Sequence, residues 1–407
     1  MRIAYISQYF YPEQFSNNAL ARSLVDKGHD VDVITCVPNY PEGVFTDGYS
    51  NKTRREDDWC GVRIHRAWTI ARGQRAIQLI ANYLAFVVTG IWTARKVARK
   101  HRPDISFVSM PSPVFQALVG IYLKRRFKVP LVYWVQDIWP ESATYSLNLR
   151  SPVIIKPLTW LCGWIYRQAD HIMVQSDAFP PMIMRFGVPS VKVSVFPNTA
   201  AEMYQPVTPD MQSEEAEMMP ATGFRIIFAG NIGESQDFDT IIATAKELGD
   251  LHNVQWIIIG SGRDCDRVIA RVKDTELDNR FHFLGRFPES RMPHFFAHAD
   301  AMLVSLKRNN IFALTVPYKV QTYLACGKPV IASLDGEGAR VISEAQAGVV
   351  APTQSPQLLA QAITTLVQSS QTQRQQYGNN GRAYFEQNYA SEILFNRLEK
   401  ILADAVT

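Results

Sequence analysis

The sequence predicts an α/β fold with two domains, each built around a parallel sheet. A chain of 407 residues is long enough for about two domains, each with a core of its own. Short, fully apolar runs alternate with stretches of helical spacing, which is typical of parallel strands covered by helices on both faces. A polar, acidic, proline-containing segment, 198–223, divides these runs into two sets and is interpreted as the linker between the domains.

The first set of apolar runs predicts five strands. They are residues 3–6, 31–35, 105–109, 131–135 and 172–175. Between the first two runs, Leu20 and Leu24 have the spacing of one helix face, and Gly28 ends that helix where a left-handed residue is favoured. We therefore expect a Rossmann-like domain over residues 1–200.

The second set predicts six strands. They are residues 224–230, 254–262, 281–287, 300–306, 328–333 and 347–352. Helical stretches separate them, so a second Rossmann-like domain is expected over residues 201–389. Two such domains place a ligand cleft at the carboxyl ends of their strands, because the loops there direct N–H groups and helix N-termini at the crevice.

The composition excludes several classes of protein. Charged residues make up 20% and apolar residues 47% of the chain, which are globular values. The net charge of +4 is only mildly basic and no basic stripe with base-reading aromatic residues is found, so nucleic acid is not expected as a partner. The five cysteines are scattered without CxxC spacing, which favours free thiols. The N-terminus begins directly with a strand and shows no signal peptide, so we expect the protein inside the cell.

The stretch 76–94 is apolar and nearly as long as a membrane span, and basic residues flank it from Arg63 to Arg102. Gln78, Asn82 and two threonines argue against a true span, which would also interrupt the strand order of the sheet. Three interpretations remain open. The stretch forms one or two amphipathic helices that meet a membrane surface with the help of the arginines, or it is buried entirely in the core, or it spans a membrane.

Two strand–glycine–helix turns predict a diphosphate site in the second domain. One is the loop from Gly230 to Gly233, and the other contains Gly260, Gly262 and Arg263. Such turns offer free N–H groups and the positive end of a helix dipole to an anion, and Arg263 and Lys319 would neutralise a leaving diphosphate without a metal. No metal ligand is expected, because the DCD sequence at 264–266 is better explained as an acidic first helical turn.

Nine motifs follow one another along the chain, and together they carry a resemblance. They are GHDVDVIT, PDISFVSMPSP, VYWVQDIWPES, HIMVQSD, FAGNIG, IIIGSG, FHFLGRF, LACGKPV and AGVVAP. In this order and spacing, over essentially the whole chain, they resemble the retaining glycosyltransferases of family GT4. That family has the GT-B fold, in which two Rossmann-like domains face each other across a central cleft. The fold implies that a final helix, 390–407, crosses back to the first domain.

Two motifs narrow the resemblance to one branch of the family. VQDIWPES with VPYKVQTYLACGKPV is closest to the bacterial O-antigen and capsule branch, which includes the L-fucosamine (N-acetyl-L-fucosaminyl) transferases. The chain also departs from the family pattern. The usual glycine pair after the first strand is replaced by Ser16–Asn18, an Arg and a Lys of the donor loop by Asn231 and Gln236, and a His by Gln136.

The family's paired glutamates fall on Ala313 and Gln321, within a stretch, 309–333, that has no acidic residue. Gln321 retains an acceptor oxygen for ribose hydroxyls and adds a donor. Ala313 suggests a donor sugar with fewer hydroxyls or with a methyl group, such as a 6-deoxy N-acetylamino sugar.

The resemblance implies roles for individual residues. On the donor side we expect Arg263 and Lys319 at the diphosphate, backbone groups of Gly230, Asn231, Gly233 and Gly262 around it, Arg286 and Phe287 at the nucleoside, and Gln321 at the ribose. On the acceptor side we expect Asp137 as the base or orienting carboxylate, with Gln136, Glu141, Asn17 and Asn18. Plainer explanations exist for Lys319 as a solvated residue, for Glu141 as a first-turn cap, for Asn17 and Asn18 as N-caps, and for Phe287 as a core residue.

The expected activity is transfer of N-acetyl-L-fucosamine from a UDP donor to an N-acetylglucosamine linked to undecaprenyl diphosphate, with retention and without a metal cofactor. The protein would act in O-antigen or polysaccharide synthesis, in the cytoplasm and peripherally on the inner face of the plasma membrane. One alternative is a GT4 enzyme that uses another UDP-N-acetylhexosamine or a GDP-hexose. A sugar-nucleotide epimerase shares the fold, but the acid-free stretch speaks against it. From another class, the chain could be an inactive transferase that serves as a binding partner in polysaccharide assembly.

Overall fold

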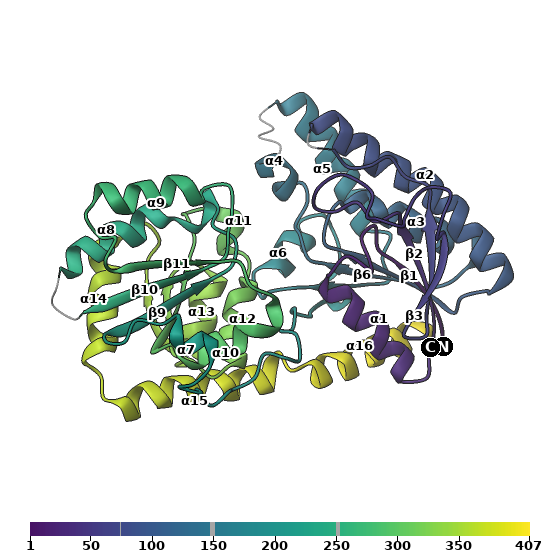
Figure 1. Ribbon diagram of the computed structural model, residues 1–407. Coiled ribbons are helices and arrows are strands. Elements are labelled where there is room, and N and C mark those ends of the chain that lie inside the picture. The colour runs from purple at the N-terminus through teal and green to yellow at the C-terminus, as the bar shows by residue number, and fades with distance from the viewer. Residues whose placement is uncertain (74, 147–150, 250–252) are drawn as a thin grey trace. The chain divides into compact units, whose positions relative to one another are not determined.

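The computed structural model describes residues 1–73, 75–146, 151–249 and 253–407. It divides the chain into two compact units: Met1–Pro197 together with Leu394–Thr407, and Asn198–Ile393. Each unit has a largely parallel sheet with helices on both faces (Figure 1), so the predicted α/β fold with two Rossmann-like domains is confirmed.

The sheet of the first unit has the strand order β3-β4-β2-β1-β5-β6-β7-β8. The strands are β1 (Arg2–Ile6), β2 (Asp30–Cys36), β3 (Glu56–Trp59), β4 (Val62–Ala67), β5 (Ile105–Met110), β6 (Leu131–Val135), β7 (His171–Val174) and β8 (Val193–Val195). All neighbours pair in parallel except β3 and β4, which form an antiparallel edge. The five expected strands are present, whereas β3, β4 and β8 were not expected.

Helices cover both faces of this sheet (Figure 1). They are α1 (Ser16–Asp26), α2 (Ala76–Lys100), α3 (Ala117–Phe127), α4 (Glu141–Ser146), α5 (Pro152–Tyr166), α6 (Phe179–Met184) and α16 (Ser391–Val406). Leu20 and Leu24 of α1 share one buried cluster with Leu398 of α16. On the opposite face, Ala94 of α2 packs near Ala4 of β1.

The sheet of the second unit has the order β11-β10-β9-β12-β13-β14 and is parallel throughout. The strands are β9 (Phe224–Ala229), β10 (Val254–Ile259), β11 (Phe281–Gly285), β12 (Ala301–Ser305), β13 (Val330–Ser333) and β14 (Gly348–Ala351). All six were expected. One face is covered by α8 (Phe238–Leu248), α9 (Cys265–Asp274) and α14 (Pro356–Gln368), and the other by α10 (Met292–Ala297), α12 (Tyr318–Ala325), α13 (Glu337–Glu344) and α15 (Gln371–Asn388).

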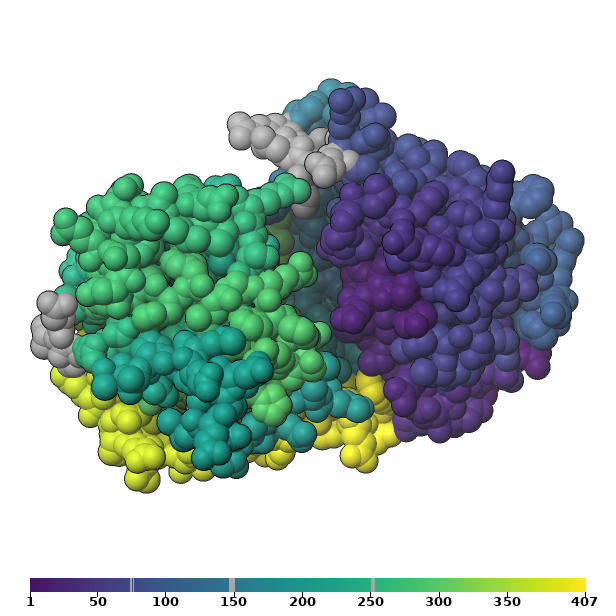
Figure 2. Space-filling view, in the orientation of Figure 1, coloured from purple at the N-terminus to yellow at the C-terminus, as the bar shows by residue number. Residues whose placement is uncertain are grey.

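The segment 198–223, expected as a linker, is part of the second unit. Ala200, Tyr204 and Met219 are buried in its core. The segment also contains the short helix α7 (Glu214–Glu217), whose Glu215 accepts from Arg291 at 2.6 Å. In Figure 2 the teal atoms of this part of the chain lie across the surface of the unit. The linker interpretation was therefore wrong for this segment, because its few apolar side chains are enough to hold it against the sheet's helices.

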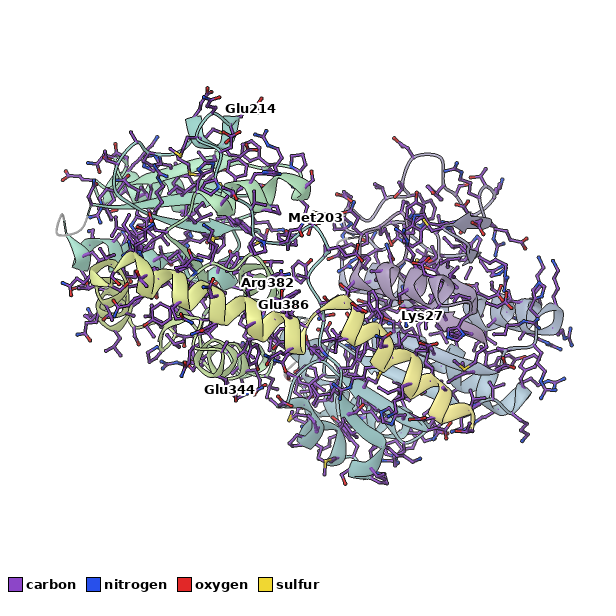
Figure 3. The ribbon with its side chains drawn as sticks, turned by 90° about the horizontal axis from the view of Figure 1, so that it is seen from below. Lys27, Met203, Glu214, Glu344, Arg382 and Glu386 are labelled. Carbon is purple, nitrogen blue, oxygen red and sulfur yellow. The ribbon has the colours of Figure 1, made fainter. Side chains whose placement is uncertain are left out.

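The end of the chain contributes to the first unit. Leu394, Leu398 and Leu402 of α16 are buried in its core. Lys27, which follows α1, lies beside α16 (Figure 3), where it pairs with Glu399 at 3.0 Å. His29 also contacts Glu399 at 3.1 Å.

The stretch 76–94, for which burial, membrane contact and a span were all considered, belongs to helix α2. It is a single helix of 25 residues, and Ile77–Lys100 is long and apolar enough to cross a membrane by length and composition. Asn82 and Phe86 are fully buried in the first unit, so one face packs in the core. The opposite face carries the apolar stripe, which we define as Ile77, Ile80, Leu84, Val88 and Trp92, exposed by 80, 48, 55, 60 and 77%. The helix is thus amphipathic, and the interpretation as a fully buried helix is wrong, whereas contact with a membrane surface and a span both stay predictions.

Candidate functional site

The two glycine loops of the second unit lie directly against each other at the carboxyl ends of β9 and β10. A Cβ atom on Gly260 would lie 1.9 Å from the carbonyl oxygen of Gly230, and one on Gly262 would lie 2.1 Å from that of Ile232. The N–H of Gly230 donates to Ile259 at 2.8 Å. The glycines are therefore needed for close backbone packing, and the expectation that the Gly230 N–H is free for a phosphate was wrong.

The next residues of the loop are better placed to donate. In the part of the chain that the structure describes, the N–H groups of Asn231 and Gly233 donate to no backbone or side-chain acceptor. The side chain of Asn231 folds back over Gly233, where a Cβ would lie 2.6 Å from Asn231 Nδ2. Two free amides next to a helical turn can bind an anion.

Lys319 lies at the beginning of α12 and extends to this loop. Its ammonium lies 3.8 Å from the ring centroid of Phe228 and donates to the Gln236 side-chain oxygen. A Cβ on Gly230 would lie 2.6 Å from Lys319 Cε. Burial lowers the pKa of Lys319 to about 7. The structure thus brings Lys319 together with Gly230, and a diphosphate beside it would favour the protonated form.

Gln321 does not join this group. Two residues apart on a helix point about 200° apart, so Gln321 is directed away from Lys319. It is 1% exposed, and its Nε2 donates to the carbonyl oxygen of Asn198 at 2.8 Å. The expected role of Gln321 at a ribose stays a prediction, because within the described residues its acceptor oxygen Oε1 has no hydrogen-bond partner. Tyr323, four residues after Lys319, lies on the same face of α12 as Lys319. Its hydroxyl accepts a hydrogen bond from the N–H of Ala229 at 3.2 Å.

Arg263 and Arg286 lie in the loops that follow β10 and β11, and both are exposed. Within the described residues neither forms an ion pair or a side-chain hydrogen bond, so both are available to a ligand. Phe287 is different, because its ring packs on Phe295 at 4.8 Å and under the Arg291 guanidinium at 5.1 Å. Its plainer explanation as a core residue is supported.

The acidic residues near these loops form ion pairs. Asp264 is the N-cap residue of α9 and Asp266 lies in its first turn, so the expected acidic first turn is confirmed. The Asp264 side chain binds Arg267 at 2.6 Å. Lys307 donates to Glu234 at 2.9 Å. Across the described ranges, no group of three or more His, Cys, Asp or Glu side chains could hold a metal ion.

Ala313 ends the short helix α11 (Asn310–Ala313). Gly336 has a φ of +67°, and a Cβ there would lie 2.0 Å from the carbonyl oxygen of Ala313. The backbone at Ala313 therefore packs tightly on the turn before α13, and its methyl group is partly exposed.

On the first unit, Asp137 follows β6 at the carboxyl edge of the sheet. Burial raises the pKa of Asp137 to about 7, and within the described residues its carboxylate accepts no hydrogen bond. The hydroxyl of Tyr83, on α2, is near enough for the negative charge of Asp137 to help burial raise its pKa. A desolvated carboxylate without a partner is suited to accept a proton from a substrate hydroxyl.

The other expected acceptor residues are engaged by the protein. Gln136 is partly exposed and lies 3.5 Å from the Ser109 hydroxyl. Glu141 does not cap α4 but accepts from Arg185 at 2.5 Å. The structure therefore keeps Gln136 beside Asp137 and gives Glu141 a partner of its own.

Asn17 and Asn18 are buried and do not cap α1, whose N-cap is Phe15 without a side-chain bond. Asn17 Nδ2 donates to Ser7 Oγ at 2.7 Å, and Asn18 Nδ2 donates to the carbonyl oxygen of Glu13 at 2.7 Å. Both N-cap explanations were wrong, and among the described residues the Oδ1 atoms of the two amides have no hydrogen-bond partner. These residues instead fix the loop between β1 and α1.

Sequence reasoning missed the side chains that hold the functional residues. Phe228 and Gln236 position Lys319, and Tyr83 lies near Asp137. Phe228 could have been found, because strand alternation places it one residue before the end of β9. Tyr83 could not, because its contact joins residues far apart in the chain.

Two family models match this chain. Residues 16–199 match the model described as glycosyl transferase 4-like domain, and residues 212–384 match glycosyl transferases group 1. Among curated proteins, a putative colanic acid biosynthesis glycosyl transferase of Escherichia coli is 22% identical over 75% of each chain. A 2-deoxystreptamine glucosyltransferase of Streptomyces kanamyceticus is 23% identical over 64% of this chain and 69% of its own.

Solved structures show the same fold. Sucrose-phosphate synthase from Thermosynechococcus elongatus superposes with a TM-score of 0.75 at 17% identity, over 99% of this chain and 98% of that one. Anabaena HepE in complex with UDP gives 0.70 at 15% identity, over 99% and 100%. WaaG, a glycosyltransferase involved in lipopolysaccharide biosynthesis, gives 0.65 at 13% identity, over 100% and 99%.

Proposed function

Because the chain belongs to the glycosyl transferases of group 1 and has the GT-B fold, we propose that it transfers a sugar from a UDP donor, with retention and without a metal cofactor. The observation that carries this proposal is the environment of Lys319. Its ammonium lies between the Phe228 ring and the glycine loop, in the second unit, next to the free amides of Asn231 and Gly233. This arrangement supplies one charge and two N–H donors to a leaving diphosphate.

The reaction follows from the residues on each unit. In the second unit, Lys319 and the two amides stabilise the negative charge that develops on UDP as the glycosidic bond breaks. In the first unit, Asp137 orients the acceptor hydroxyl and takes its proton as the new bond forms. We propose that the hydroxyl attacks from the side on which UDP leaves, which gives retention without a protein nucleophile.

We infer that the donor sugar is N-acetyl-L-fucosamine. This proposal is supported by Ala313, whose small, partly exposed side chain leaves no carboxylate to bind sugar hydroxyls and suits the methyl group of a 6-deoxy sugar. Gln321, buried against Asn198, supplies no replacement. Another UDP-N-acetylhexosamine or a GDP-hexose would offer more hydroxyls to carboxylates that this stretch lacks.

The acceptor we propose is an N-acetylglucosamine linked to undecaprenyl diphosphate, used in O-antigen or a related polysaccharide. The protein would lie on the cytoplasmic face of the plasma membrane. The apolar stripe of α2 supports this placement, because five exposed apolar side chains on one helix face suit the boundary of a bilayer. Arg95, Lys96 and Arg99 continue along the exposed side of the helix and would meet anionic headgroups.

Calorimetric titration of the protein with UDP, GDP and UDP-N-acetyl-L-fucosamine, with and without EDTA, tests the donor. We expect UDP and its fucosamine conjugate to bind equally well with and without EDTA, and GDP to bind more weakly. A transfer assay followed by NMR of the anomeric proton tests retention. Failure to bind any nucleotide would favour an inactive binding partner, and preference for GDP would favour a GDP-hexose donor.

A further inference from the structure

Arg72 is fixed in the loop between β4 and α2 by both its backbone and its side chain. Its N–H donates to Asn39 Oδ1 at 2.9 Å, and its guanidinium lies 4.9 Å from the ring centroid of Tyr40. One carboxylate holds both of these neighbours, because Glu13 Oε1 accepts the N–H groups of Asn39 at 2.7 Å and of Tyr40 at 2.6 Å. The position of the guanidinium is therefore determined before any ligand arrives.

This cation has no acidic partner in the described part of the chain. Other partly buried arginines of the first unit do have one: Arg63 binds Asp32 at 2.8 Å, and Arg66 binds Asp57 at 3.2 Å. Arg72 is only partly exposed, so solvent compensates its charge less well than that of a surface arginine. A preorganised guanidinium without a counter-ion is suited to bind phosphate oxygens.

Arg72 and the proposed acceptor base, Asp137, both act electrostatically on the hydroxyl of Tyr83. Burial raises the pKa of the Tyr83 hydroxyl, the positive charge of Arg72 opposes this rise, and the negative charge of Asp137 adds to it. Both charged groups are therefore within electrostatic range of one hydroxyl. The apolar stripe of α2 begins five residues after Arg72, at Ile77.

Three kinds of chemistry thus follow one another on the first unit. They are a carboxylate for a sugar hydroxyl, a guanidinium for phosphate, and an exposed apolar helix face. A sugar joined through a diphosphate to a polyprenyl chain has its parts in the same order. We propose that Arg72 binds the diphosphate of such an acceptor, and that the enzyme distinguishes a lipid-linked diphosphate from a free sugar through this residue. The inference rests on the proposed function, since it names the group that recognises the acceptor.

The test uses the full chain and three soluble probes that share one hydrocarbon: farnesyl diphosphate, farnesyl phosphate and farnesol. We expect the wild-type protein to bind the diphosphate at least about tenfold more tightly than the alcohol, because charge-assisted bonds contribute more than neutral ones. Arg72→Gln should bind all three with similar affinity. Arg126→Gln, which removes a surface arginine from α3, serves as the matched control and should keep the wild-type order.

Further measurements test whether Arg72 binds the diphosphate. Arg72→Lys keeps the charge but not the planar fork, so it should retain part of the preference for the diphosphate. Equal discrimination by wild type and Arg72→Gln, or no preference in the wild type, would overturn the proposal. UDP titration of each variant distinguishes a failure of the proposed role of Arg72 from a failure of the proposed function. If UDP binds normally while the probes are not distinguished, only the role of Arg72 fails; if UDP does not bind to the wild type, the proposed function fails as well.

Discussion

The ammonium of Lys319 donates to the side-chain oxygen of Gln236, so a cation from α12 lies where the loop after β9 presents its own side chain. The family pattern places a lysine in that loop. Here the neighbouring helix supplies the charge instead, and Gly230 leaves the space through which the lysine stem passes. At the proposed diphosphate site, a cation from α12 thus lies where the family pattern has a lysine of the loop.

Removing this cation should weaken nucleotide binding and stabilise the fold. Lys319→Met loses a charged bond to the diphosphate, which corresponds to a decrease in UDP affinity of about 10- to 100-fold.

The same variant should change the pH dependence of stability. The folded-state pKa of Lys319, about 7, lies below the ordinary value of 10.5. Between these pH values the unfolded chain binds more protons, so wild-type stability rises with pH. The variant should lack this rise and unfold a few degrees higher at neutral pH. Thermal unfolding between about pH 7 and 10 measures how stability changes with pH, with Lys307→Met as the control. If the unfolding temperature of Lys319→Met changes with pH as steeply as that of the wild type, the burial argument is contradicted.

Binding of UDP should be coupled to proton uptake. Above pH 7 the amine of Lys319 is largely neutral, and a diphosphate beside it favours the ammonium. Titration calorimetry in buffers of different ionisation enthalpy should therefore give different observed enthalpies at about pH 8. Lys319→Arg, which stays charged, should show no such dependence. A wild-type enthalpy that is the same in every buffer would rule out the coupling.

Exchanging the side chains of Gln236 and Lys319 should preserve most of the affinity for UDP. Gln236→Lys alone places a second positive charge beside Lys319 and should destabilise the loop. The double variant Gln236→Lys/Lys319→Gln returns the charge to the loop, and we expect UDP affinity within about tenfold of wild type. A double-mutant cycle measures the coupling, and additive losses would show that the two positions are not equivalent.

Asp137→Asn should reduce kcat by about 100-fold or more while UDP affinity stays unchanged, since the carboxylate acts on the acceptor. Because burial raises the pKa of Asp137 to about 7, its carboxylate forms as the pH rises through this value, and wild-type kcat/KM should rise with it. Asp47→Asn, an exposed aspartate of the same unit, is the control. A flat pH profile between about 6 and 8 would exclude Asp137 as the base.

Polar substitution on the apolar stripe should release the protein from membranes. Val88→Gln combined with Trp92→Gln removes much of its exposed apolar area, so binding to vesicles of phosphatidylglycerol and phosphatidylethanolamine should fall by about tenfold or more. Vesicle sedimentation measures this effect. Val406→Gln, on α16 and 40% exposed, is the matched control. Undiminished sedimentation of the stripe variant would contradict the membrane proposal.

Strands such as β6, β7 and β9 could be predicted because nearly all of their residues are buried and apolar. The antiparallel edge could not, because β4 alternates buried and half-buried residues and includes Arg66, whose side chain is 0% exposed. That burial is tolerated because Asp57 of β3 pairs with the guanidinium and Tyr49 stacks on it at 4.8 Å. Such compensation is visible only when distant segments are brought together.

In the candidate site, too, residues with a local sequence signature could be predicted, whereas those that depend on distant contacts could not. Glycines and Lys319 were found because a strand–glycine–helix turn has a local signature. Gln321 is directed away from Lys319, as helix geometry predicts, but its bond to Asn198 could not be predicted, because it joins residues far apart in the chain. Arg72 was noticed only as one of several flanking charges, because its support comes from Glu13 and Asn39, which lie far from it in the chain.

Helix α16 has a consequence for how the protein is made. Its three leucines complete a core whose other members lie before residue 197, so the ribosome must synthesise the entire second unit before the first can close. Until then α1 and its strands leave an uncovered apolar face, whereas Asn198–Ile393 is continuous and can fold as soon as it emerges. We therefore expect the second unit to mature first, and the nascent first unit to be the part of the chain that most needs chaperones.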